Sequence, residues 1–189
     1  MSDMQLESLR RSFSVREFHR MGEIGIFGPD EQVELLDGQL IAVPPMGERH
    51  WSLVSRMHRV LAQRTAGRAT VVAQLPIVLA GDSEPLPDVA VLRYDPRDYE
   101  TGKPGVADIF VLVEVADSSL ALDRTTKLKL YERARVPEYW IVNVREGTIT
   151  SYRDPHADGY RVVHEYGRGA LIDLPGFPEL VLTVEELLG

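Results

Sequence analysis

Cysteine is absent from the 189-residue chain, which excludes disulfide bonds, thiolate-bound zinc and a cysteine nucleophile. Long apolar runs are absent as well, because no segment approaches the roughly 20 apolar residues that a helix needs to cross a bilayer. The N-terminal stretch MSDMQLESLRRSF also has no apolar core of the kind found in signal peptides. We therefore expect a soluble cytoplasmic protein without a membrane partner.

An excess of basic residues is missing too. The chain has 21 Lys and Arg against 29 Asp and Glu, a formal net charge of −8, which argues against a protein that coats nucleic acid through its overall charge. A nucleic-acid partner would need a locally basic face. Two regions offer one: residues 49–81 contain five arginines and no acid, and Lys127 is surrounded by Arg124, Lys129, Arg133 and Arg135. A solvated helix face explains this pattern equally well.

Repeats, low-complexity tracts and linkers are also lacking. With 44% hydrophobic and 26% charged residues, the composition is that of an ordinary globular protein. A chain of this length fits one domain with a sizeable core, so residues 1–189 are expected to form a single domain.

Helix and turn signals mark the N-terminal third. Ser14 and Glu17 have the spacing of a capping box, which predicts a short helix from Val15. The Asp37-Gly38 pair inside VELLDGQLIAV predicts a hairpin. A helix is expected from about Glu48 to Thr65 because apolar residues recur on one face there.

Four apolar runs then predict strands that are covered on both faces: ATVVAQLPIVLA, PDVAVL, IFVLVEVA and YWIVNV. The stretch LALDRTTKLKLYERA, between the last two runs, has helical spacing. GTITSYRD and GYRVVHEY predict a C-terminal hairpin, and VEELL a short last helix. The predicted fold is α/β (α+β), a mixed β-sheet flanked by helices.

Two acids interrupt this apolar pattern. Asp88 begins the second strand and Glu114 lies late in the third, although an unpaired buried carboxylate costs several kcal/mol. If these strands form an antiparallel pair, the two acids meet at one edge. Such a pair suits Mg²⁺, which binds one or two carboxylates together with water, and bound water becomes a better nucleophile.

Lys127 is the third candidate. It shares a helical stripe with Leu130, Tyr131 and Ala134 and should point toward the sheet, whereas Lys129 should face water. An inward ammonium near two carboxylates and a metal can orient water or neutralise charge on a phosphate. The alternatives are an ion pair with Glu114 that only ties the helix to the sheet, or a surface bridge to Asp123.

These residues resemble the PD-(D/E)XK nuclease superfamily, whose motif matches Pro87-Asp88 and Glu114. Its simple motif would place lysine where this chain has Ala116. The stretches LPDVAVL, VEVADSS, DRTTKLKLY and VPEYWIVN are similar to the Uma-two family of restriction endonucleases, in which the lysine stands on the following helix, as Lys127 does.

The resemblance implies a restriction endonuclease-like fold and a divalent-metal-dependent endonuclease that hydrolyses DNA with Mg²⁺ or Mn²⁺. It implies Asp88 and Glu114 as metal ligands, Lys127 as the residue that positions the water, and Glu34 as an additional acid. Because an enzyme that cuts both strands gains from two-fold symmetry, a homodimer is also expected.

Other residues have weaker grounds. Gln74 is the lone polar residue within VVAQLPIVL and is expected to contact substrate, although satisfying buried backbone explains it too; Arg124 belongs to the basic flank of the same substrate site. His50 is interpreted as a hydrogen-bonded core histidine rather than a ligand. Tyr139 and Trp140 are expected near an exposed sheet edge or in the core. Two rival functions stay open: an inactive nuclease-fold module that binds nucleic acid or protein, and a glycosidase with paired carboxylates.

Overall fold

The N-terminal elements lie where the sequence predicts them in the computed structural model, which describes residues 11–189. Helix α2 is Val15–Glu23, and its capping box forms: Ser14 N donates to Glu17 Oε2 (2.9 Å) and Glu17 N donates to Ser14 Oγ (3.2 Å). Strands β1 (Gln32–Leu36) and β2 (Gln39–Val43) make the hairpin, which is a separate two-stranded sheet. Helix α3 is Glu48–Thr65.

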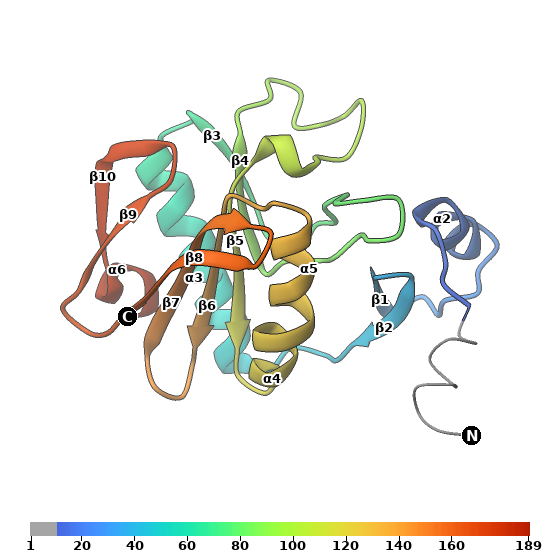
Figure 1. Cartoon of the computed structure of the whole chain (residues 1–189), viewed down its shortest axis with the longest axis horizontal. Helices are drawn as coiled ribbons and strands as arrows, with labels where there is room; N and C mark the ends of the chain where they lie inside the picture. Colours follow the sequence, from blue (N-terminus) through green and yellow to red (C-terminus); the bar gives the residue numbers. More distant parts are fainter. Residues whose placement is uncertain (1–10) are drawn as a thin grey trace.

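A six-stranded mixed sheet forms the centre of the molecule (Figure 1). Its spatial order follows the chain from β3 to β8, and β5 and β6 are the parallel neighbours in an otherwise antiparallel arrangement. The strands are β3 (Ala69–Val72), β4 (Val89–Arg93), β5 (Ile109–Ala116), β6 (Glu138–Asn143), β7 (Thr148–His156) and β8 (Gly159–Tyr166). The predicted mixed sheet and the β7–β8 hairpin are confirmed.

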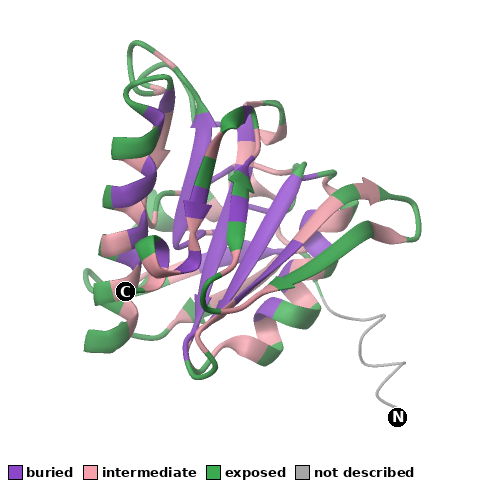
Figure 2. Cartoon of the chain, turned by 90° about the vertical axis from the view of Figure 1, so that its left-hand side faces the viewer, coloured by how far each residue is buried: buried purple, intermediate pink, exposed green. Residues whose placement is uncertain are grey.

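Helices cover both faces of this sheet, and the central strands are therefore buried (Figure 2). Alternate strand residues point to opposite faces. Val89 and Val91 pack with the apolar side of α3, whereas Ala90 and Leu92 pack in the cluster that contains α5 (Leu128–Arg133). Helix α5 continues from α4 (Leu120–Leu122) through a π-helical turn, η2 (Asp123–Lys127).

Three expectations differ from the structure. The run from residue 69 to 80 is not one strand: β3 ends at Val72, and Gln74 turns the chain with φ +52° while its N–H donates to the carbonyl of Pro87 (3.1 Å). Tyr139 and Trp140 are fully buried, because β6 is an interior strand and not a sheet edge. The core-packing interpretation of this pair is therefore the correct one.

The third difference is an additional hairpin before the last helix. Strands β9 (Leu171–Leu174) and β10 (Phe177–Thr183) form a two-stranded sheet, followed by α6 (Val184–Leu188). Gly176 turns this hairpin at φ +78°, and a side-chain carbon there would collide with the ring of Phe110. The glycine and prolines of LPGFPELVL hid these strands, because such residues are typical of loops.

No helix within residues 11–189 has the combined length and apolar character needed to cross a membrane. The sequence expectation about a signal segment falls mainly on residues 1–10, outside the described residues.

Candidate active site

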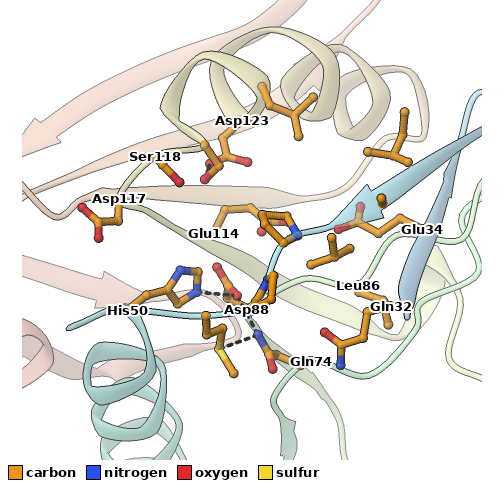
Figure 3. Close-up of a pocket in the computed structure, with 18 of the residues that line it drawn as sticks. Gln32, Glu34, His50, Gln74, Leu86, Asp88, Glu114, Asp117, Ser118 and Asp123 are labelled. Atoms are coloured by element: carbon orange, nitrogen blue, oxygen red, sulfur yellow. Dashed lines mark hydrogen bonds and ion pairs between the residues drawn. The ribbon is translucent and has the colours of Figure 1, made fainter. Parts of the chain in front are cut away.

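A cavity of about 120 Å³ lies where six segments of the chain meet: the β1–β2 hairpin, the start of α3, the turn at Gln74, the start of β4, the end of β5 and the α4–η2 stretch. We call it the acidic cavity (Figure 3). Its lining includes Glu34, His50, Asp88, Glu114 and Asp123, which Figure 3 labels. Lys127 lines it as well. The cavity thus gathers residues from nearly every part of the first two thirds of the chain.

Asp88 and Glu114 meet as the sequence predicts. Strands β4 and β5 are antiparallel with Val89 opposite Val113, so the residue before Val89 and the residue after Val113 lie side by side. Asp88 is held on both carboxylate oxygens: Oδ2 accepts from the backbone N–H of Val115 (2.8 Å), and Oδ1 is 2.9 Å from His50 Nε2. Gln74 Nε2 also donates to Oδ1 (3.2 Å).

Lys127 points inward from η2 and is only 4% exposed. Its Nζ donates to Glu34 Oε1 and to Glu114 Oε1, both at 3.0 Å, and the hydroxyl of Tyr131 donates to the same Glu114 oxygen (2.7 Å). A surface bridge to Asp123 is therefore not what this lysine forms. Burial alone would lower the pKa of Lys127, but the surrounding carboxylates, Glu114 foremost, raise it above its ordinary value, and the ammonium stays charged.

Acids outnumber cations in this buried space. Glu34, Asp88, Glu114 and Asp123 are all less than a tenth exposed, and Lys127 is the buried cation among them. Burial raises the pKa of Glu114 well above its usual range and raises the pKa values of Glu34 and Asp123 as well. In addition, Glu34 Oε2 is buried with no hydrogen-bond partner among the described residues. This surplus of acceptor oxygens fits an additional cation.

The donor set suits a hard ion held largely by water. Within residues 11–189, no three His, Asp or Glu side chains converge into a ready-made ligand cage. Mg²⁺ requires no such cage, because it keeps several waters and uses one or two carboxylates. Asp88 and Glu114 fit as that pair, with Glu34 beside them.

Two residues, His50 and Asp123, belong to the cavity although the sequence did not indicate them as site residues. His50, expected as a core histidine, is satisfied as expected, but its partner is Asp88 and it lines the cavity. The hydrogen bond to Asp88 raises the pKa of His50, with burial opposing. The sequence suggests Asp123 only as a surface partner of Lys127. In the structure Asp123 is buried, and Ser119 Oγ donates to its Oδ2 (2.6 Å).

Of the two residues expected to bind substrate, one lines the cavity and the other does not. Gln74 lines the acidic cavity through its contact with Asp88, as expected, while Arg124 is exposed and lies outside the lining. The sequence contains a signal that could have placed Asp123 in the site, since a spacing of four residues from Lys127 puts both on one helix face. For His50 the sequence offers no signal of a site role beyond its place on the inward side of α3.

The fold and these residues together define a restriction endonuclease-like protein: a mixed sheet with two acids at the meeting ends of antiparallel strands and a lysine on the next helix. The solved structure of a protein titled "putative nuclease belonging to DUF820", from Anabaena variabilis ATCC 29413, superposes with a TM-score of 0.72 at 19% identity, over 93% of this chain and 97% of that one. This similarity supports the fold.

The family follows from the sequence itself. Residues 15–185 match the model of the Uma2 family, described as "Putative restriction endonuclease", and the chain belongs to that family. No curated protein matches the chain.

Proposed function

We propose that this protein is a divalent-metal-dependent nuclease that hydrolyses phosphodiester bonds of DNA. The observation that carries the proposal is the convergence of Asp88, Glu114 and Lys127 in one buried cavity whose acids exceed its cations. The interpretation of Glu114 and Lys127 as a purely structural tie accounts for their ion pair. It gives no reason for Glu34 Oε2, which is buried with no hydrogen-bond partner within residues 11–189.

In the proposed mechanism, Asp88 and Glu114 would hold a Mg²⁺ or Mn²⁺ ion. Such an ion would supply Lewis acidity and increase the acidity of water bound to it. His50, Gln74 and the N–H of Val115 fix Asp88 in one orientation, because each makes a hydrogen bond to its carboxylate. Lys127 keeps a positive charge beside Glu114, where it can orient the attacking water or neutralise charge on the phosphate. Glu34 is the acid that assists from the β1–β2 hairpin.

The rival is a module that keeps this fold and binds nucleic acid without cutting it. The hydrogen-bonded constraint of Asp88 on both oxygens favours the enzyme, because a binding surface has no need of a fixed buried carboxylate. A glycosidase built on Asp88 and Glu114 would not need divalent cations and would give Lys127 no task.

Plasmid cleavage tests the proposal. Wild-type protein with Mg²⁺ or Mn²⁺ should nick or linearise supercoiled DNA, and EDTA should stop it. Asp88→Asn should lower the rate at least about 100-fold, since it removes a charged metal ligand, whereas Asp158→Asn, an exposed change in the β7–β8 turn, should leave the rate unchanged. A parallel assay on RNA identifies the nucleic acid that is cut.

Cleavage that survives EDTA, or that is equal in the Asp88→Asn and Asp158→Asn variants, would contradict the proposal. Binding of DNA without cleavage under every metal condition would support the module instead. Three further expectations belong to the same proposal: one domain over residues 1–189, a homodimer, and a cytoplasmic location.

A further inference from the structure

A second cavity, of about 610 Å³, adjoins α3 and is lined by four arginines: Arg49, Arg56, Arg145 and Arg168. We call it the arginine cavity. The two acids in its lining are Glu146 and Glu185. Four arginines against these two acids leave an excess of positive charge in the lining. The cavity is therefore locally basic on a chain whose net charge is −8.

Among residues 11–189, three of these arginines form no ion pair with a side-chain carboxylate, whereas Arg168 Nε lies 3.8 Å from Glu185 Oε1. Two guanidinium groups lie against Gly189, which also lines the cavity: Arg168 Nη2 donates to its carbonyl oxygen (3.4 Å), and Arg56 packs beside it. Arg49 donates from Nη2 to the carbonyl of Val144 (2.7 Å), which fixes its position and leaves its other donors available. Unpaired guanidiniums gathered around one hollow are an anion-binding arrangement.

The arginine cavity and the acidic cavity lie at the same end of the sheet, where the interior strands β5 and β6 terminate. Parallel strands β5 and β6 end together, with Ala116 opposite Asn143 and Val144 N donating to the Ala116 carbonyl (3.1 Å). The residues directly after β5 line the acidic cavity, and those directly after β6 line the arginine cavity. The first turns of α3 serve both, through His50 on one side and Arg49 on the other.

We propose that the arginine cavity binds phosphodiester groups of the nucleic acid next to the position where the strand is cut. The proposal rests on the proposed function, because it is the neighbouring acidic cavity that makes a polynucleotide the expected anion. Arg56 and Arg145 contact the phosphates, and Arg49 supports them from its anchored position. Binding at this cavity places the strand but does not select its sequence, as phosphate contacts carry no base information.

Fluorescence anisotropy with a labelled DNA duplex tests this inference without any cleavage. Measurements are made in EDTA and again in Ca²⁺, each over a series of salt concentrations. The double variant Arg56→Gln/Arg145→Gln should bind about tenfold or more weakly than wild type. The slope of log K against log[salt] should fall by about 1.8, since each lost phosphate contact removes about 0.9.

A control variant with the same loss of charge is Arg59→Gln/Arg97→Gln, which removes two exposed arginines outside the cavity lining, one of them on α3. It should keep the wild-type slope and bind within about twofold of wild type. Thermal unfolding of both double variants checks that they fold. Arg49 and Arg168 are left intact because each donates a hydrogen bond to a backbone carbonyl.

Equal slopes for the two double variants would overturn the inference, as would a wild-type protein that binds no duplex in either condition. Inorganic pyrophosphate and poly-glutamate are the competing probes. If the cavity variant loses either of these but keeps duplex affinity, the cavity serves a small phosphate or an acidic protein, and the inference is wrong. Failure of the proposed function gives a different result, namely duplex binding that depends on Arg56 and Arg145 without cleavage in Mg²⁺ or Mn²⁺.

Discussion

At the residue scale, Lys127 pairs with two of the four buried acids of the site. Its ammonium lies 3.0 Å from an oxygen of Glu34 and 3.0 Å from an oxygen of Glu114. These two acids come from segments far apart in the sequence, the β1–β2 hairpin and β5. One side chain therefore joins the hairpin, the helix and the central sheet.

Replacing Lys127 by methionine keeps much of its volume and removes its charge. The unfolding free energy should fall by about 3–5 kcal/mol at pH 8, because two buried carboxylates lose their partner. The loss should be smaller at pH 5: the pKa values of Glu34 and Glu114 are already raised by burial, so these groups take up protons more readily than ordinary acids. Urea denaturation at the two pH values measures both quantities.

Lys129→Met is the matched control, since Lys129 stands two residues further along and is exposed. Its effect should stay within about 0.5 kcal/mol at both pH values. Similar losses for the two variants would show that Lys127 contributes no more than a surface lysine does.

At the element scale, strand pairing explains how the site could be predicted. The apolar runs of β4 and β5, with an acid at one end of each, indicate Asp88 and Glu114 from the sequence alone, because antiparallel pairing brings those ends together. The inward direction of Lys127 followed from helical spacing. The partners of Glu34 could not be derived in this way, because no local pattern says where a separate two-stranded hairpin packs.

The contact between His50 and Asp88 could not be predicted from the sequence for the same reason. Its bond to Asp88 spans 38 positions and depends on how the start of α3 meets the start of β4. The π-helical turn at Asp123–Lys127 was likewise not foreseen, since its residues fit an ordinary α-helical stripe equally well.

Glu138, at the start of strand β6, should make the stability of the fold depend on pH. Glu138 forms an ion pair with Arg153 of β7 (2.8 Å) and accepts from the indole N–H of Trp140. Burial raises the pKa of Glu138 to about 7, against the lowering effect of Trp140 and Arg153. The folded state therefore favours the protonated acid. Stability from this group is complete below about pH 4.5 and is lost as the pH rises through about 7.

Glu138→Gln should remove this dependence while keeping an oxygen for Trp140. Relative to wild type, the variant should gain stability between pH 5 and pH 8, by up to about 3 kcal/mol. Chemical denaturation across that range gives the difference directly. A difference that is flat with pH would mean that Glu138 keeps an ordinary pKa in the folded protein.

At the scale of the whole molecule, the sheet order and the helices on its two faces agree with the sequence pattern, and the β9–β10 hairpin does not. Buried strands such as β5 have a strong apolar signal, whereas β9 and β10 are half-exposed and are separated by a turn that contains Pro175 and Gly176. The acidic cavity and the arginine cavity both lie beyond the ends of the neighbouring parallel strands β5 and β6.

The most direct test of the central claim is a crystal of the wild-type protein soaked in Mn²⁺. The anomalous difference map should contain one peak between Asp88 and Glu114, with an oxygen of each at about 2.1 Å, and the peak should disappear in crystals of Asp88→Asn. A map without a peak there, or a manganese ion that touches neither carboxylate, would contradict the account.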